Sequence, residues 1–156
     1  MFLATVTMLF AAFTSAYIVR RSGSDWQHIA LPPMLWINTG VLVASSIAVE
    51  FAYAQGTRRR LRTSRTAMAL AVVLGLVFLA GQVVAWRQMV AAGVYLPTSP
   101  HSSFFFMLTG AHAVHVVAAL VVLAWGAWTL RLSLCRTFWH YLGGVWLFLF
   151  ALVTWL

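Results

Sequence analysis

Three histidines lie in or beside strongly apolar stretches of this sequence, where an imidazole is either a ligand or a structural group: His112, His115 and His140. Imidazole is the commonest protein ligand for metal ions, and it also binds haem iron. His112 and His115 are three residues apart, so on a helix they lie on one side and cannot bind the two opposite faces of a haem. We therefore expect structural rings that bond a hydroxyl, a carbonyl or a lipid headgroup across a helix contact, and no catalytic or metal-binding residue.

The two acidic residues, Asp25 and Glu50, are the next candidates for chemistry. A carboxylate deep in a membrane span is costly and usually functional, for example in proton transfer. Asp25 falls in a polar loop, whereas Glu50 falls about one turn from the end of an apolar stretch and precedes a run of arginines. Because a glutamate there can extend toward the membrane surface, we interpret Glu50 as one half of an interfacial ion pair with Arg58. A proton-holding site is the alternative.

The stretches that carry these residues are long enough to cross a bilayer. Of 156 residues, 63% are hydrophobic and 8% are charged, whereas soluble domains are about a quarter charged. A helix needs about 20 apolar residues to cross the hydrocarbon core. The sequence therefore predicts one all-α domain, a polytopic membrane helical bundle with five spans at 2–19, 35–54, 67–86, 104–130 and 138–156. The first stretch has no positively charged start, so we expect a retained helix rather than a signal peptide.

All ten basic residues are arginines, and they are distributed unevenly between the predicted loops. Seven follow the second and fourth spans, and three follow the first and third. Arginine-rich loops stay on the cytoplasmic side, so the count predicts an N-terminus inside and a C-terminus outside. No suitably placed aromatic side chains accompany the arginines, so we expect no nucleic-acid partner. The single cysteine, Cys135, has no disulfide partner in the chain and shows no zinc-site spacing.

Small residues recur every fourth position in two spans, which predicts faces where another helix approaches closely. They are Gly40, Ala44, Ala48 and Ala52 in the second span and Ala67, Ala71 and Gly75 in the third, with Gly110 and Ala111 beside the histidine pair.

Short motifs in several spans also occur in the order and spacing of a known family. On these motifs the chain resembles subunit III of the haem-copper terminal oxidases, in the short five-helix form found in some bacteria. The residues that carry the resemblance are Asn38 and Thr39, Gln82 and Trp86, then Leu108, Thr109, Gly110, His112, His115 and Val116, and finally Trp139, His140, Val145 and Trp146.

The resemblance implies an accessory, non-metal-binding subunit of a proton-pumping oxidase, most simply a cytochrome c oxidase of aerobic respiration. Haem and copper would belong to catalytic subunit I, its main contact, with subunit II as a further neighbour. The chain would stabilise subunit I and organise structural phospholipid in the cytoplasmic membrane of a bacterium. A companion of a quinol oxidase or of a nitric oxide reductase is the alternative, and an independent membrane carrier or a membrane haem protein is less favoured.

Three departures from the family pattern concern carboxylates. The family has acids at the positions that Val6, Ala85 and Gly143 occupy here. Any role of those acids in proton supply or lipid contact therefore does not transfer to this chain. The first two of the family's seven helices also have no counterpart, so a lipid cleft between them and the other five is not expected.

Overall fold

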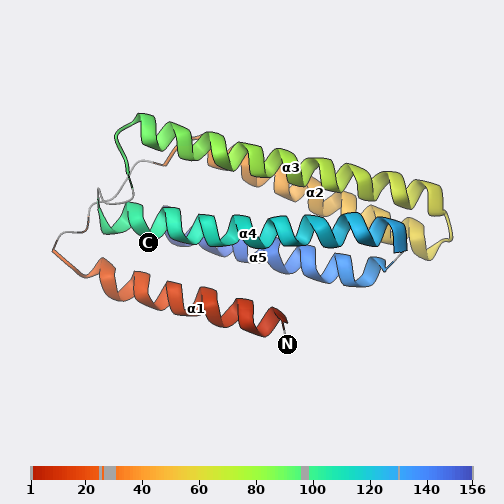
Figure 1. Cartoon of the computed structure of the whole chain (residues 1–156), viewed down its shortest axis with the longest axis horizontal. Helices are drawn as coiled ribbons and strands as arrows, with labels where there is room; N and C mark the ends of the chain where they lie inside the picture. The colour runs from red at the N-terminus through yellow and green to blue at the C-terminus, as the bar shows by residue number, and fades with distance from the viewer. Residues whose placement is uncertain (1, 25, 27–30, 96–98, 130, 156) are drawn as a thin grey trace.

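The computed structural model describes residues 2–24, 26, 31–95, 99–129 and 131–155, and these form an all-α bundle, as predicted (Figure 1). Asp25 lies outside the described residues. Each helix is long and apolar enough to cross a membrane. In chain order they are α1 (Phe2–Arg21), α2 (Met34–Thr57), α3 (Leu61–Ala91), α4 (Pro100–Thr129) and α5 (Leu132–Trp155).

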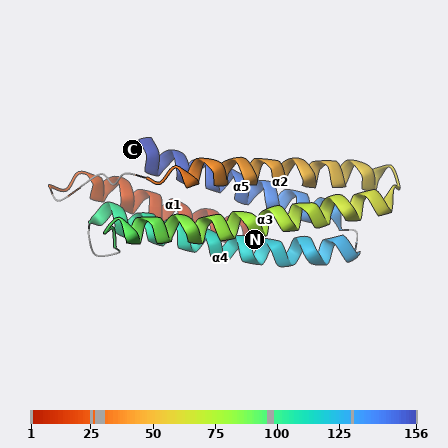
Figure 2. The same cartoon turned by 90° about the horizontal axis from the view of Figure 1, so that it is seen from above.

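Helices α2 to α5 form a closed ring, and α1 is added to its outside. Around the ring α2 packs on α3, α3 on α4, α4 on α5 and α5 on α2, whereas the main contact of α1 is with α4. All helices run nearly along one axis, as Figures 1 and 2 show from two directions. The ring has an interior in which polar side chains from different helices can meet.

The helices extend beyond the predicted spans at several ends. α3 runs from Leu61 to Ala91, whereas the predicted span was 67–86, and α5 begins at Leu132 rather than at residue 138. The length of an apolar run identifies only the part of a helix that crosses the hydrocarbon core of the membrane. The backbone hydrogen bonds of the helix continue beyond it into polar turns. The arginine-rich loop is correspondingly short, because only residues 58–60 separate α2 from α3. Arg59 adopts a left-handed conformation there, with φ of 59°, which reverses the chain in a tight turn.

The small-residue face predicted for the third span is where α3 contacts its neighbours. Ala67, Ala71 and Gly75 are buried, and a Cβ added at Gly75 would lie 2.5 Å from Leu120 Cδ2 and 2.8 Å from Trp139 Cη2. A larger residue at Gly75 would therefore force the Leu120 side chain of α4 or the Trp139 side chain of α5 to move.

The face predicted for the second span is only half correct. Ala48 and Ala52 are buried, but Gly40 and Ala44 are exposed. The buried face of α2 runs instead through larger and polar residues such as Leu35, Asn38 and Ser45. Small side chains recur at helical spacing on more than one side of α2, so their spacing alone did not select the buried one.

Candidate functional site

The motif residues Asn38 and Gln82 meet inside the ring. Asn38 Nδ2 donates to Gln82 Oε1 at 3.4 Å, which joins α2 to α3. Both side chains are almost fully buried, at 1% and 2% exposure. The space is tight, because a Cβ at Gly81 would overlap the Asn38 side chain. An amide pair is a suitable contact at this depth, since each amide has both donors and an acceptor.

Two tryptophan–threonine pairs join further helices of the ring. Trp146 Nε1 donates to Thr39 Oγ1 at 3.1 Å, between α5 and α2. Trp86 Nε1 donates to Thr109 Oγ1 at 3.1 Å, between α3 and α4. Each threonine hydroxyl in turn donates to the carbonyl one turn earlier in its own helix, so the hydroxyl can accept the indole. The predicted motif residues thus connect α2, α3, α4 and α5 through their side chains.

Three further cross-helix bonds involve Ser45, Ser64 and Cys135. Ser45 Oγ donates to Ala71 O at 2.9 Å and Ser64 Oγ to Ala52 O at 2.7 Å, both between α2 and α3. Cys135 Sγ contacts Val122 O at 3.4 Å between α5 and α4. Serines within an apolar helix are a signal for such bonds, but the sequence does not identify which carbonyl accepts.

His112 does not make the hydrogen bond across a helix contact that we expected. Its side chain is 1% exposed, and neither ring nitrogen has a hydrogen-bond partner among the described residues. The imidazole is instead surrounded by aromatic rings, with centroids 5.2 Å from Trp146, 6.2 Å from Phe78 and 6.3 Å from Phe10. Ring contacts with α1, α3 and α5 therefore replace the predicted polar contact.

His115 faces α1 rather than the ring interior. Its Nδ1 lies 2.7 Å from Ala111 O in its own helix, and its ring centroid lies 5.6 Å from that of Phe10. A separation of three residues turns the second side chain by about 60° from the first on a helix of 3.6 residues per turn. That rotation is enough to direct the two imidazoles into different environments.

We expected Gly110 to face the backbone of a neighbouring helix. It faces open space within this chain instead, since a Cβ added there would meet nothing within 4 Å.

Among the described residues, no group of three or more His, Cys, Asp or Glu side chains is arranged to hold a metal ion.

Glu50 forms a polar cluster with α5, and its partner differs from the predicted one. Glu50 Oε1 accepts from Arg136 Nε at 2.6 Å and contacts His140 Nε2 at 2.7 Å. The ion pair is therefore made with Arg136 and not with Arg58. Arg58 lies near Glu50 in sequence but follows the end of α2, whereas Arg136 is directed toward Glu50 by the packing of α5 on α2. Because a carboxylate only accepts hydrogen bonds, the bond requires the proton of His140 to be on Nε2.

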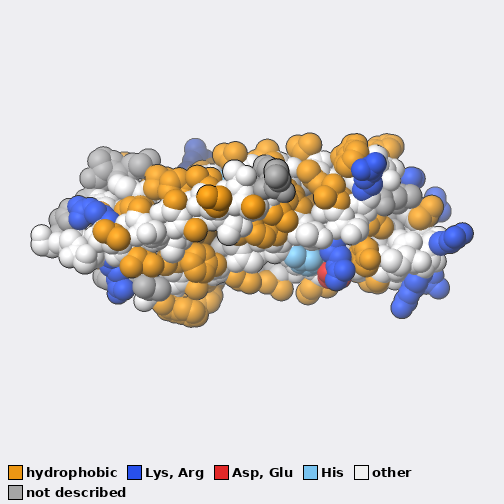
Figure 3. Space-filling view, turned by 90° about the horizontal axis from the view of Figure 1, so that it is seen from below, with side chains coloured by type: hydrophobic (Ala, Val, Ile, Leu, Met, Phe, Trp, Pro, Cys, Tyr) orange, Lys and Arg blue, Asp and Glu red, His pale blue; other side chains and the backbone are white. Residues whose placement is uncertain are grey.

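This cluster, Glu50, Arg136 and His140, is partly exposed, with 36–44% of each side chain accessible. The guanidinium of Arg136 also lies over the ring of Tyr53, 4.7 Å from its centroid. Figure 3 shows acidic, basic and histidine side chains meeting at one place on this face, while the other visible arginines gather toward the two ends of the bundle. Trp139, next to His140, is buried at 1% exposure.

The positions where the family has acids are enclosed here. Val6 is 2% exposed and Ala85 is fully buried. Gly143 is also buried, and a Cβ there would lie 3.7 Å from Ser46 Oγ of α2. Apolar or absent side chains at these positions leave no charge to be compensated in the interior.

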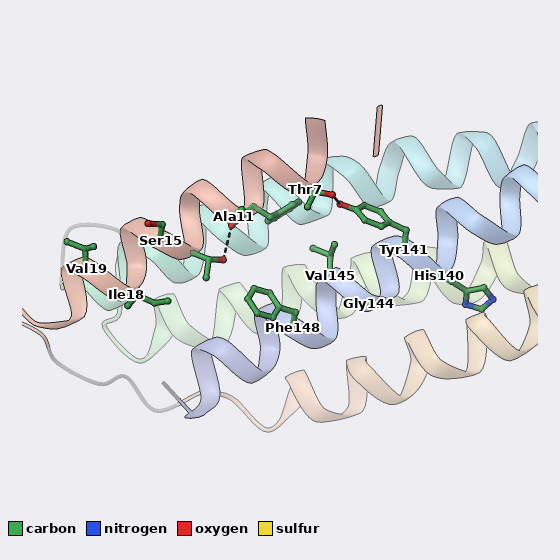
Figure 4. Close-up of a pocket in the computed structure, with 12 residues that line it drawn as sticks. Thr7, Ala11, Ser15, Ile18, Val19, His140, Tyr141, Gly144, Val145 and Phe148 are labelled. Atoms are coloured by element: carbon green, nitrogen blue, oxygen red, sulfur yellow. Dashed lines mark hydrogen bonds between the residues drawn. The ribbon is translucent and has the colours of Figure 1, made fainter. Parts of the chain in front are cut away.

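Two open grooves flank α5. One has a volume of about 780 Å³ and lies between α1 and α5, where Thr7 and Tyr141 are joined by a 2.7 Å hydrogen bond (Figure 4). The other has a volume of about 410 Å³ and lies between α2 and α5. His140 and Gly144 line both.

Comparison with known proteins matches the whole chain, residues 1–156, to the family described as cytochrome c oxidase subunit III. A cytochrome c oxidase subunit 3 of Corynebacterium diphtheriae is 30% identical over 97% of this chain and 83% of its own length. A protein of the same name from Thermostichus vulcanus is 24% identical over 97% of this chain and 82% of its own length. That of Petromyzon marinus is 30% identical over 76% of this chain and 49% of its own length.

Proposed function

The chain belongs to the cytochrome c oxidase subunit III family, and on this premise we propose that it is an accessory subunit that performs no bond-making step itself. It is a subunit III of a haem-copper oxidase and a multi-pass membrane protein. The family match over residues 1–156 is the observation that carries the proposal.

The contacts of the motif residues support a structural role. Asn38, Thr39, Gln82, Trp86 and Trp146 all bond across helices, and these bonds hold the ring in one arrangement. The haem and copper of the oxidase are assigned to the catalytic subunit, which this chain would cover and stabilise. Subunit I is its main proposed contact and subunit II a further one.

The proposed location is the cytoplasmic membrane of a bacterium, in line with the bacterial relatives. The arginine count supports an orientation with the turn at residues 58–60 inside and the end of α5 outside. Exposed apolar side chains on every helix suit contact with lipid acyl chains or with other subunits.

The test is purification of the tagged chain in mild detergent, followed by identification of the proteins that accompany it and a visible spectrum. We expect an oxidase complex whose haem absorption stays with the catalytic subunit when this chain is dissociated. Stoichiometric haem or copper on the isolated chain, or purification without any oxidase subunit, would contradict the proposal.

A further inference from the structure

Five exposed arginines gather at the turn between α2 and α3 and in the first turns of α3. They are Arg58, Arg59, Arg60, Arg62 and Arg65. The short turn brings them to one end of the bundle, where Figure 3 shows basic side chains gathered. The orientation of the chain needs only their number, so the groups that neutralise their charge are a separate question.

The chain supplies no carboxylate to these arginines. The sequence contains two acidic side chains, Asp25 and Glu50. Asp25 is separated from the arginines by the whole of α2 in the sequence, and Glu50 is paired with Arg136 at 2.6 Å. None of the five guanidinium groups makes an ion pair with a residue that the structure describes. Any fixed counter-charge therefore comes from outside the chain.

The depth of Arg62 and Arg65 in the membrane corresponds to the lipid headgroups. The apolar run of α3 begins at Ala67, the first residue of the predicted span. At a rise of 1.5 Å per residue, Arg65 and Arg62 lie about 3 Å and about 8 Å beyond the hydrocarbon along the helix. The headgroup layer is about 5–8 Å thick on each side of the bilayer. Both arginines therefore lie in the layer that contains the phosphates.

The face of α3 that carries these two arginines continues into exposed apolar side chains. Residues three or four apart are neighbours on a helix surface, and the ones that follow one another at this spacing are Arg62, Arg65, Ala69, Val73 and Leu76. All five are exposed, with Val73 and Leu76 at 54% each. Guanidinium groups above a stripe of aliphatic side chains match both parts of a phospholipid, whereas an acidic peptide outside the membrane would match only the arginines.

We propose that Arg62 and Arg65 bind the phosphate of an anionic phospholipid whose acyl chains lie along the exposed face of α3. Arginine suits this ligand, because its planar guanidinium can donate two parallel hydrogen bonds to phosphate oxygens. The three arginines of the turn favour a headgroup with a net negative charge over a zwitterionic one. The inference rests on the proposed function, which sets the chain in a membrane, and adds a lipid site on a helix that lines neither groove beside α5.

Photolabelling of the intact complex, reconstituted in vesicles, tests the proposal. Phosphatidylglycerol with a diazirine in its acyl chain is the anionic probe, and phosphatidylcholine with the same acyl chain is the zwitterionic control. Labelled peptides are identified by mass spectrometry. We expect phosphatidylglycerol to label the peptide that contains Val73 and Leu76 at least about fivefold more than phosphatidylcholine does.

Replacing both arginines should abolish this preference. The double variant Arg62→Gln with Arg65→Gln keeps five arginines on this side of the membrane against three on the other, so the orientation is retained. Both side chains are exposed, so their replacement leaves the packing of the bundle intact. Arg87→Gln is the matched control, because Arg87 is a single exposed arginine just beyond the opposite end of the same span. It should leave the preference unchanged.

Two results would overturn the lipid site. One is equal labelling by the two lipids, or a preference that survives the double replacement. The other concerns benzoylphenylalanine at Thr66, which is exposed between the arginines and the apolar stripe. We expect its adducts to be with lipid, and adducts with another oxidase subunit would show that a protein covers this face. The proposed function fails separately, if no oxidase subunit accompanies the tagged chain, since the lipid preference is measured whatever the partner.

Discussion

Trp146 on α5 and Thr39 on α2 are joined by a 3.1 Å hydrogen bond from the indole Nε1 to the hydroxyl Oγ1, across 107 residues of sequence. The same tryptophan has its ring centroid 5.0 Å from that of Phe78 on α3 and 5.2 Å from that of His112 on α4. One side chain therefore contacts all the other helices of the ring, and its indole supplies the polar part of that contact.

Removing this hydrogen bond should destabilise the bundle modestly. Thr39→Val keeps the shape of the side chain but removes the acceptor, and Trp146→Phe removes the donor. Hydrogen bonds between membrane helices average about 0.6 kcal/mol and reach about 1.7 kcal/mol, so we expect a coupling energy in that range from a double-mutant cycle. Thermal unfolding in detergent measures it. Thr66→Val is the control, because the Thr66 hydroxyl bonds only within α3 and its loss should leave stability nearly unchanged.

Glu50 should react poorly with carbodiimides, which modify protonated carboxyl groups. Its ion pair with Arg136 and its bond to His140 stabilise the ionised carboxylate. We expect little labelling of Glu50 in the wild-type complex and more in Arg136→Leu, where the cation is lost. Peptide mass spectrometry locates the label. Strong wild-type labelling of Glu50 together with loss of proton pumping would instead identify Glu50 as a proton-transfer group.

His112 should tolerate replacement by a ring of similar size. Because its imidazole is enclosed by Phe10, Phe78 and Trp146, His112→Phe keeps the packing, whereas His112→Ala leaves a cavity and loosens the contact of α4 with its neighbours. We expect His112→Phe to remain bound to the complex and His112→Ala to dissociate more readily in detergent. The rate of oxygen uptake per assembled complex should be unchanged in both.

A native gel paired with an oxygen-uptake trace distinguishes this structural role from a chemical one. A metal ligand or proton donor at His112 would lose turnover on replacement by phenylalanine while assembly stayed intact. His115→Ala is the companion variant, since His115 faces α1 and bonds its own helix. Its effect should be confined to the attachment of α1.

The orientation predicted from the arginines can be tested with reporters at the two ends of α3. A reporter inserted at Arg60, in the turn before α3, should be cytoplasmic, and one at Gly93, after α3, should be external. Seven arginines lie on the same side of the membrane as Arg60 and three on the side of Gly93, so the arginine distribution strongly favours this orientation. An external reporter at Arg60 would reverse the orientation of every span.

The sequence by itself determined the all-α architecture and the identity of the family. Apolar runs about as long as the hydrocarbon core is thick leave helices as the only spanning structure for such segments, because each backbone polar group must bond within its own helix. The motif residues were likewise recognisable, since their types and spacing are local properties. Asn38, Gln82, Trp86 and Trp146 all proved to lie at contacts between helices.

Tertiary structure decided which side chains meet. Glu50 was assigned to Arg58 because the two are close in sequence, whereas the packing of α5 on α2 brings Arg136 to it. His112 was expected to bond a polar group, and it lies among aromatic rings from three other helices. The face of α2 that is buried was also set by its neighbours, since small residues occur on more than one side of that helix. Partners across helices depend on the rotation and depth of each helix relative to the others, and these are fixed by the packing of all five together.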